Sequence, residues 1–269
     1  MRARNPQPQN SVCKSHPMDG NINSWNLIAR EYDALITRGD FFREQLLNPA
    51  INALLPYLSG KRILDAGCGQ GYLSDAMHKK GASVVGVDAS ENLIALAKEH
   101  YKESDTLAFS MHDLRSPLKF FDGSFDGVVS NMVLMDFDPI DGAVLELGRI
   151  TKAGGFFIFS ILHPFFVSGV VRKNFAEILQ GQLPHYELSQ YTTQFRKDWR
   201  VQGVSHETEV YHRPLEYYSR ILHSAGFYIS DIREPVFSMH SVAEKGSSAK
   251  LLTEIPMFLV VRAEKMPTH

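Results

Sequence analysis

The chain has 269 residues, of which 44% are hydrophobic and 22% charged, and its formal net charge is −2. This length suffices for one sizeable α/β core, and the near-neutral charge argues against nucleic acid or an anionic membrane as a partner. No apolar run reaches the length of a membrane span, residues 1–4 lead into polar sequence rather than a signal-peptide core, and two cysteines suggest no disulfide framework. We therefore expect a cytoplasmic protein.

The N-terminal part divides into a tail and a helical cap. Residues 1–21 are rich in Asn, Gln, Pro and Ser, which predicts a disordered tail, and residues 22–269 are expected to form a single domain. Ser24 is the predicted N-cap of a first helix in the cap, residues 22–60. A second helix in this cap is expected to bend or break at Pro49.

Residues 61–162 are predicted to form the core, in which buried strands alternate with helices. The strands end at Asp65 and Asp88 and then cover about 107–111, 125–130 and 156–162. Such alternation predicts a parallel sheet with helices on both faces. Residues 213–263 complete this core with a helix after Pro214 and two strands, at 227–232 and 255–261. A loop without a crossover helix joins these strands, so we expect the last one to run antiparallel.

The pattern breaks in residues 163–212, which we interpret as an insertion that folds over the carboxyl edge of the sheet as a substrate lid. Its composition is dense in aromatic residues, namely Phe165, Phe166, Phe175, Tyr186, Tyr191, Phe195, Trp199 and Tyr211.

The most informative stretch is Asp65-Ala66-Gly67-Cys68-Gly69-Gln70-Gly71, a strand end, a tight turn and the start of a helix. Glycines let the backbone adopt positive φ and let a ligand approach the main chain closely. The spacing G-x-G-x-G lacks the third glycine of a dinucleotide-binding loop, whose place Tyr72 takes. Asp88 ends the next strand, roughly 20 residues further on, where an acid can accept both hydroxyl hydrogens of a ribose.

These two signals resemble the class I S-adenosylmethionine-dependent methyltransferases, in the small-molecule group similar to the ubiquinone-biosynthesis enzymes. The resemblance implies a Rossmann-like, seven-stranded, mostly parallel sheet and S-adenosylmethionine as the cofactor. It places the amino acid and sulfonium part on the glycine loop, the ribose at the second strand, the adenine after the third and the methionine end after the fourth. Tyr32 lies in an "A-x-x-Y-D" sequence that would lean on the methionine end. The cofactor-binding residues implied are Tyr32, Asp65, Gly67, Cys68, Gly69, Gly71, Asp88, Ala89, Ser90, Asp113, Leu114, Asn131 and Met132.

The acceptor is expected to be a small organic molecule, quinone-like or another natural product, methylated on oxygen, nitrogen or carbon. The fourth-strand loop lacks the Asn-Pro-Pro-Tyr motif of nitrogen methylation, and neither cysteine follows a proline as in cytosine methylation. Asp136, Asp138 and Asp141 are interpreted as a helix N-terminus, and no metal site is predicted.

His212 and His163 are the candidate catalytic residues, because a histidine titrates near neutrality and can remove a proton from the acceptor. His212 is preferred, because a short turn fixes its backbone just before a helix. Packing roles for both histidines stay open. Two other functions also stay open: an NAD-dependent oxidoreductase and a cofactor-binding protein without transferase activity. The sequence leaves the oligomeric state open as well, including a homo-oligomer.

Overall fold

The computed structural model describes residues 20–172, 185–242 and 251–267. Most of the predicted tail therefore lies outside the described residues. Its last two residues, Gly20 and Asn21, belong instead to helix α1 (Gly20–Arg38). The predicted N-cap Ser24 lies inside this helix, where its hydroxyl donates to the carbonyl of Gly20 at 3.3 Å. Helix α1 thus includes two residues that the sequence assigns to the tail.

The helical cap continues with a π-helical turn, η1 (Arg43–Leu47), and then α2 (Asn48–Leu54), with Pro49 in the first turn of α2. Proline has no N–H to donate, so the regular hydrogen-bond ladder cannot run through it from the preceding turn. The hydrogen-bond pattern changes from π to α at Asn48, one residue before Pro49, whereas the helical backbone conformation continues through it.

The core is a seven-stranded sheet with the order β10-β11-β5-β4-β1-β2-β3. Its strands are β1 (Arg62–Ala66), β2 (Ser83–Asp88), β3 (Leu107–Met111), β4 (Phe125–Asn131), β5 (Thr151–Leu162), β10 (Phe227–Arg233) and β11 (Phe258–Lys265). The first five run parallel to one another, and β11 is antiparallel to both β5 and β10. The predicted fold class is therefore confirmed.

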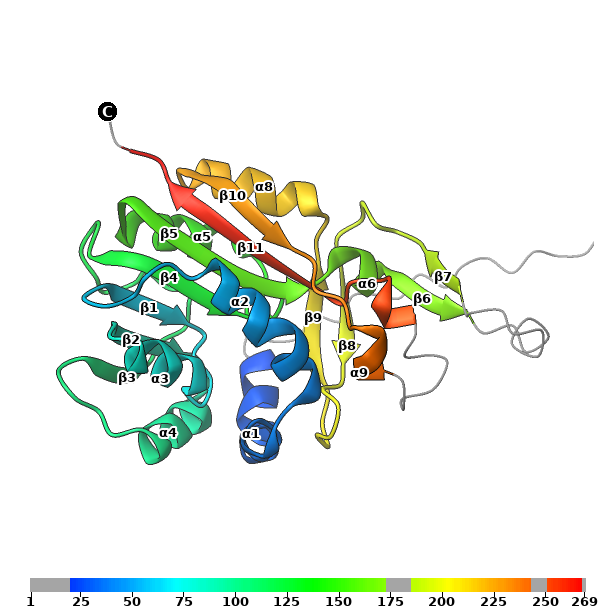
Figure 1. Cartoon of the computed structure of the whole chain (residues 1–269), viewed down its shortest axis with the longest axis horizontal. Helices are drawn as coiled ribbons and strands as arrows, with labels where there is room; N and C mark the ends of the chain where they lie inside the picture. The colour runs from blue at the N-terminus through cyan, green and yellow to red at the C-terminus, as the bar shows by residue number, and fades with distance from the viewer. Residues whose placement is uncertain (1–19, 173–184, 243–250, 268–269) are drawn as a thin grey trace, which may run out of the picture.

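Helices cover both faces of this sheet (Figure 1). They are α3 (Tyr72–Lys79), α4 (Glu91–His100), α5 (Asp141–Ile150) and α8 (Leu215–Ser224). The central strands are largely buried, as expected for a parallel sheet covered on both sides; Ile63, Val128 and Phe157, for example, have no exposed surface. The edge strands β3 and β10 are more exposed. The strand order reverses between β1 and β4, and such a switch point is where open α/β sheets bind their ligands.

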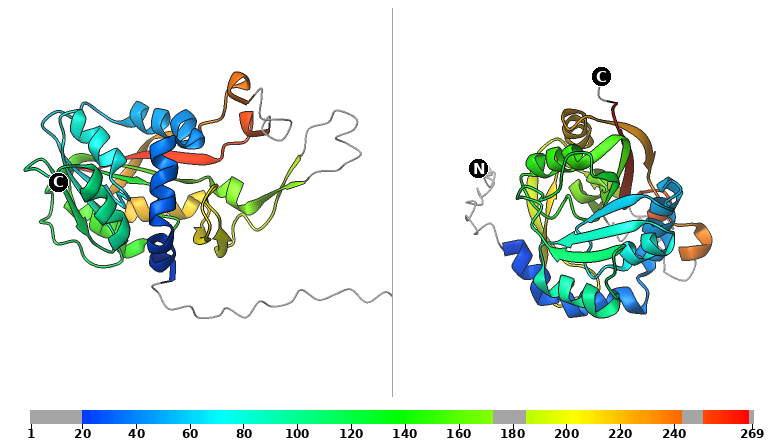
Figure 2. Two further views of the ribbon diagram at one scale, coloured as in Figure 1. Left: turned by 90° about the horizontal axis from the view of Figure 1, so that it is seen from below. Right: turned by 90° about the vertical axis from the view of Figure 1, so that its left-hand side faces the viewer.

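The described part of residues 163–212 contains a short helix and two antiparallel strand pairs. The elements are α6 (Pro164–Ser168), β6 (Gly169–Arg172), β7 (His185–Leu188), β8 (Phe195–Trp199) and β9 (Thr208–His212). The pair β6–β7 reaches out from the body of the molecule, whereas β9 lies beside α1 (Figures 1 and 2). Phe175 and the side chain of Tyr186, two of the predicted lid aromatics, lie outside what the structure describes.

Two short helical segments, α9 (Met239–Val242) and the 3-10 turn η2 (Leu251–Thr253), complete the chain before β11. Among the described helices, none combines the length and the apolar character that a membrane crossing needs.

Candidate active site

The glycine loop follows β1, and its three glycines have φ angles of 81° at Gly67, 55° at Gly69 and 88° at Gly71. A Cβ on Gly67 would lie 2.2 Å from a methyl group of Val133, and one on Gly71 would lie 2.9 Å from the ring of Phe109. At Gly69, by contrast, the nearest atom would be 4.0 Å away. Gly67 and Gly71 are therefore required by packing, whereas the backbone of Gly69 borders open space.

The carboxylate of Asp88 fixes this loop from the end of the neighbouring strand. One of its oxygens accepts a hydrogen bond from the backbone N–H of Gly69 at 2.9 Å, and the other accepts from Ser90 at 2.8 Å. Ser90 itself is buried and caps α4, accepting from Leu93 at 3.2 Å. Asp88 thus holds the glycine loop and the start of α4 in one arrangement.

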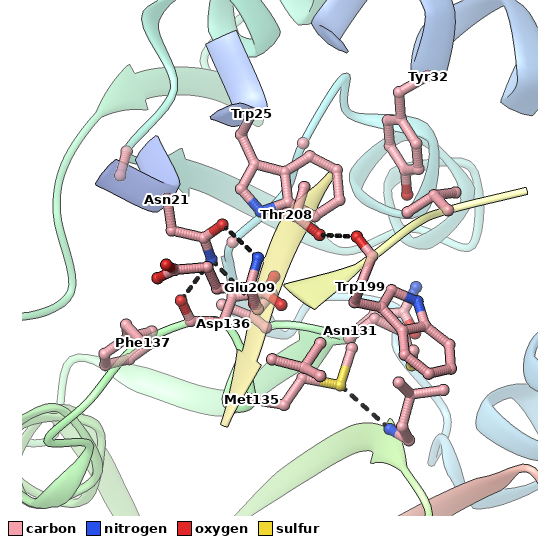
Figure 3. Close-up of a pocket in the computed structure, with 18 of the residues that line it drawn as sticks. Asn21, Trp25, Tyr32, Asn131, Met135, Asp136, Phe137, Trp199, Thr208 and Glu209 are labelled. Carbon is pink, nitrogen blue, oxygen red and sulfur yellow. Dashed lines mark hydrogen bonds between the residues drawn. The ribbon is translucent and has the colours of Figure 1, made fainter. Parts of the chain in front are cut away.

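These elements enclose a cavity of about 430 Å³ at the switch point of the sheet. Side chains from α1, from the segment after β4 and from the β8–β9 hairpin surround it (Figure 3). Of the residues implied for cofactor binding, those in its wall are Tyr32, Gly67, Gly69, Asp88, Ala89, Asp113, Leu114, Asn131 and Met132.

A smaller hollow of about 30 Å³ shares part of this wall and adds Asp65 and Cys68. The Cys68 sulfur packs closely against Gly86 of β2, so its side chain fills the turn. Two predicted residues line neither hollow: Ser90, which caps α4, and Gly71, which packs on Phe109.

The segment after β4 is held in an unusual backbone conformation. Met132 has a φ of 62°, which is uncommon for a residue other than glycine. Its N–H donates to the carbonyl of Ser160 at 3.0 Å, and the Ser160 hydroxyl donates to Asn131 at 2.6 Å. The Asn131 amide in turn donates to the hydroxyl of Tyr72 at 2.7 Å. Backbone strain that is held by several hydrogen bonds is typical of a functional site.

Asp113, the acid implied for the adenine end, is bound by its neighbour. Its carboxylate forms an ion pair with Arg115 at 2.6 Å. Burial alone would raise the pKa of Asp113, but the hydrogen bonds from Arg115 outweigh it and lower the pKa. Asp113 is therefore a charged carboxylate whose charge Arg115 already balances.

Two other carboxyl groups have no such compensation. Burial raises the pKa of Asp65 to about 7, against a hydrogen bond from Ser74 at 2.6 Å, and the charge of Asp88 adds to the effect. Burial also raises the pKa of Asp88, and its backbone hydrogen bonds offset this only in part. Neither has an ion-pair partner among the described residues. A cationic ligand would favour the charged form of both.

Arg43, at the start of η1, supplies a positive charge to the same cavity. Its side chain is 9% exposed, and only Nη2 has a hydrogen-bond acceptor, the carbonyl of Ile36 at 2.8 Å. Its Nε and Nη1 have no hydrogen-bond partner in the described structure, and its guanidinium lies 4.2 Å over the ring of Tyr72. Arg43 also lines the large cavity. A buried guanidinium with unused donors is suited to a carboxylate.

Comparison with known proteins shows which family combines these features. Residues 64–159 match the family described as "Methyltransferase domain". The ubiquinone biosynthesis O-methyltransferase of Albidiferax ferrireducens is 30% identical over 182 residues, which cover 63% of this chain and 71% of that protein. The chain belongs to the class I S-adenosylmethionine-dependent methyltransferases.

Two further similarities agree with this family. A ubiquinone biosynthesis O-methyltransferase of Methylococcus capsulatus is 36% identical over 108 residues, which are 39% of this chain and 45% of that one. The chain spans about half the length of most curated relatives that it matches. The crystal structure of an S-adenosylmethionine-dependent methyltransferase from Mesorhizobium loti superimposes with a TM-score of 0.69 at 26% identity, over 85% of this chain and 99% of that one. The predicted family and its cofactor, S-adenosylmethionine, are thereby confirmed.

Neither of the two candidate catalytic histidines lines the cavity that the described residues form. The ring of His212 stacks on Phe195 at 4.6 Å, and its Nε2 lies 2.7 Å from the carbonyl oxygen of Tyr191. His163 caps α6, and its Nε2 lies 2.8 Å from the carboxylate of Glu234. Burial lowers the pKa of both histidines. They are packed, neutral side chains of the inserted segment.

Asn21, Arg43 and Asp136 are polar residues of the cavity wall that the sequence did not assign to the site. Asn21 was assigned to the tail, and Arg43 gave no signal because its π-helical turn has no recognisable pattern. Asp136 was interpreted as part of a helix N-terminus, but α5 begins only at Asp141. The one available signal was that Asp136 follows a strand end at the switch point, where ligand-binding side chains are expected.

Proposed function

We propose that this chain transfers the methyl group of S-adenosylmethionine to a small organic acceptor bound in the same cavity. The observation that carries the proposal is the charge pattern, with uncompensated Asp65 and Asp88 on one side and the partly unpaired Arg43 on the other. S-adenosylmethionine has an ammonium, a sulfonium and a carboxylate that match these charges. The pyrophosphate of NAD would instead bring negative charge towards two carboxylates, which is unfavourable.

Asp65, Arg43, Tyr32 and Asn131 would hold the amino acid end of the cofactor, and Asp88 would hold its ribose. An ionised carboxylate has about four acceptor positions. The backbone N–H groups of Gly69 and Ser90 use two of those of Asp88. The remaining positions suffice for two ribose hydroxyls.

When bound, S-adenosylmethionine supplies a methyl group on a positively charged sulfur that leaves as a neutral thioether. The contribution of the chain is to hold the acceptor in line with that methyl group and to exclude water, and good positioning alone lowers such barriers by roughly 7–11 kcal/mol. Trp25, Phe137 and Trp199 line the cavity (Figure 3), which favours a planar, apolar acceptor. The O-methyltransferases among the similar proteins favour oxygen as the methylated atom. A cytoplasmic location and the absence of nucleic-acid partners also belong to this proposal and rest on composition.

The test is transfer of a radiolabelled methyl group from S-adenosylmethionine to a panel of phenols, quinols, indoles and amines, with product identification by mass spectrometry. We expect turnover of at least one aromatic class and release of S-adenosylhomocysteine. Tight binding of S-adenosylmethionine without transfer to any compound would favour a cofactor-binding protein without transferase activity. Failure to bind S-adenosylmethionine would overturn the proposal.

A further inference from the structure

The segment between β4 and α5 is fixed in place by contacts from distant parts of the chain. The four successive carbonyl oxygens of residues 134–137 each accept a hydrogen bond, over distances of 2.6 to 3.0 Å. The donors are both terminal nitrogens of Arg213, the backbone N–H of Tyr211 and the side-chain amide of Asn21. Asp136 is the only acidic residue among these four. Its backbone is therefore held rigidly from both α1 and β9.

The side chain of Asp136, unlike its backbone, is not fixed by hydrogen bonds from the described residues. It lines the cavity and is half-buried, yet no hydrogen bond or ion pair to its carboxylate is found among the described residues. Figure 3 shows it among Asn21, Phe137 and Glu209 in the cavity wall. The backbone of Asp136 is fixed by hydrogen bonds, whereas its carboxylate has no partner among the described residues. Such a side chain is arranged to act on a bound molecule rather than to stabilise the fold.

We infer that Asp136 accepts the proton of an aromatic hydroxyl while that hydroxyl is methylated. The inference rests on the proposed function and names the chemistry of its acceptor. The hydroxyl oxygen forms the new O–CH3 bond, the S–CH3 bond breaks with its electron pair going to sulfur, and the hydroxyl proton passes to the carboxylate of Asp136. The protonated carboxyl then releases this proton to water after the products leave.

The electrostatics of the site suit this task. Burial raises the pKa of Asp136 well above its usual range, and the charge of Asp88 raises it further. An ordinary carboxylate is a weak base towards a phenol, whose pKa is about 10, and a raised pKa narrows this gap. An aromatic hydroxyl also suits the aromatic wall formed by Trp25, Phe137 and Trp199.

The titration of Asp136 depends on the groups that face it from the surrounding elements. Asp88, Tyr32 and Tyr218 are coupled to it electrostatically. The other charged or titratable side chains in the cavity wall are Asp40, Arg43, His112, Asp113, Arg115, Asp138, Arg196, Arg200, Glu209 and Tyr211. Among the basic ones, Arg115, Arg196 and Arg200 already pair with Asp113, Glu209 and Glu207.

The experiment compares the wild type with Asp136→Asn and uses catechol and the more acidic 4-nitrocatechol as acceptors. Asp141→Asn is the matched control, since Asp141 is an exposed carboxylate outside the cavity wall that accepts a hydrogen bond from Tyr217. We expect kcat to fall about 10²–10⁴-fold in Asp136→Asn, with affinity for S-adenosylmethionine within about twofold of wild type because the cofactor contacts remain. Asp141→Asn should keep wild-type kcat.

The pH dependence distinguishes a base from a structural residue. In the wild type kcat should rise with pH, with the same midpoint for both catechols because the midpoint belongs to Asp136, and this limb should be lost in Asp136→Asn. A midpoint that follows the acidity of the catechol, or wild-type turnover by Asp136→Asn, would overturn the assignment. If the enzyme binds S-adenosylmethionine but methylates only amines, or neither catechol, the assignment of an aromatic hydroxyl as the acceptor is overturned. If the wild type does not bind S-adenosylmethionine at all, the proposed function itself is overturned.

Discussion

The side-chain amide nitrogen of Asn21 lies 2.6 Å from the backbone carbonyl oxygen of Asp136, 115 residues later in the chain. The same nitrogen donates to the carbonyl of Glu209 at 3.1 Å, and the Asn21 carbonyl oxygen accepts from the N–H of Glu209 at 2.9 Å. One side chain of α1 thus joins the segment after β4 to strand β9. These are the two walls between which we place the acceptor.

Replacing Asn21 by Ala should loosen this junction. We expect a loss of about 1–3 kcal/mol of stability, or roughly 2–4 °C in Tm per kcal/mol, and a higher KM for the acceptor than for S-adenosylmethionine. Asn23→Ala is the control, because Asn23 lies exposed on the same helix. Calorimetric melting and steady-state kinetics would contradict the expectation if the two variants behaved alike.

Alanine substitutions at Gly67 and Gly60 distinguish the effect of backbone strain from that of a steric clash. Both have positive φ, 81° and 75°, but a Cβ would clash with Val133 at Gly67 and meet nothing within 4 Å at Gly60. Gly60→Ala should cost about 1–2 kcal/mol of stability from strain alone, whereas Gly67→Ala adds roughly 1–3 kcal/mol of overpacking. We also expect only Gly67→Ala to lose affinity for S-adenosylmethionine. Equal melting temperatures and affinities in the two variants would count against the packing role of Gly67.

The raised pKa of Asp65, about 7, predicts a pH-dependent affinity for S-adenosylmethionine. Below pH 7 the carboxyl is mostly protonated and cannot balance the ammonium of the cofactor. Affinity should therefore rise as pH increases towards 7, by up to about tenfold per unit, provided that the pH stays below about 7.7, where an α-amino group begins to lose its proton. Calorimetric titrations should show this rise in the wild type and a weak, flat affinity in Asp65→Asn. A pH-independent affinity in the wild type would exclude an ionic role for Asp65.

The same carboxyl affects stability with the opposite sign. Because the folded pKa exceeds the usual value of 3.8, the folded state holds this proton more tightly than the unfolded state does. Its stabilising contribution is present at low pH and is lost as the pH rises through about 7. Saturating S-adenosylmethionine should increase Tm most at pH 7 and above, where the carboxylate is charged and lacks a partner.

His163 and His212 should behave as structural residues. Each ring is buried with a hydrogen-bond partner outside the cavity, so replacement by Ala should lower Tm and leave kcat within a few-fold of wild type. Burial lowers both pKa values, so their contribution is present above the unfolded value of about 6.5 and is lost as the pH falls through the lower folded pKa. His223→Ala, at an exposed position of α8, is the control. If either variant turned over roughly a hundredfold more slowly than wild type, a catalytic role would be restored to that histidine.

The sequence predicted the sheet and the glycine loop well because both depend on local patterns. Apolar runs that end in Asp65 and Asp88, with glycines at alternate positions after the first, indicate buried parallel strands and a ligand loop without any knowledge of distant contacts. The antiparallel last strand followed from the missing crossover helix.

The part of the cavity wall where we place the acceptor could not be predicted in this way, because its geometry depends on contacts between residues far apart in sequence. Asp136 faces the cavity because Arg213 and Asn21 hold this stretch of backbone from 76 to 115 residues away. His212 points away because Phe195 and Tyr191 cover its ring. No periodicity in the sequence indicates which side chain of such a segment faces the ligand.

The most direct test of the central claim is a calorimetric comparison of S-adenosylmethionine and NAD binding to the wild type, to Asp88→Ala and to Asp105→Ala. Asp105 is an exposed acid in the loop after α4 and serves as the control. We predict that the wild type and Asp105→Ala bind S-adenosylmethionine alike and bind NAD weakly or not at all. Asp88→Ala should lose about 1.5–3 kcal/mol of binding free energy, at least tenfold in affinity, because hydrogen bonds to a charged acceptor are lost. Preferential binding of NAD, or undiminished binding of S-adenosylmethionine by Asp88→Ala, would contradict the account.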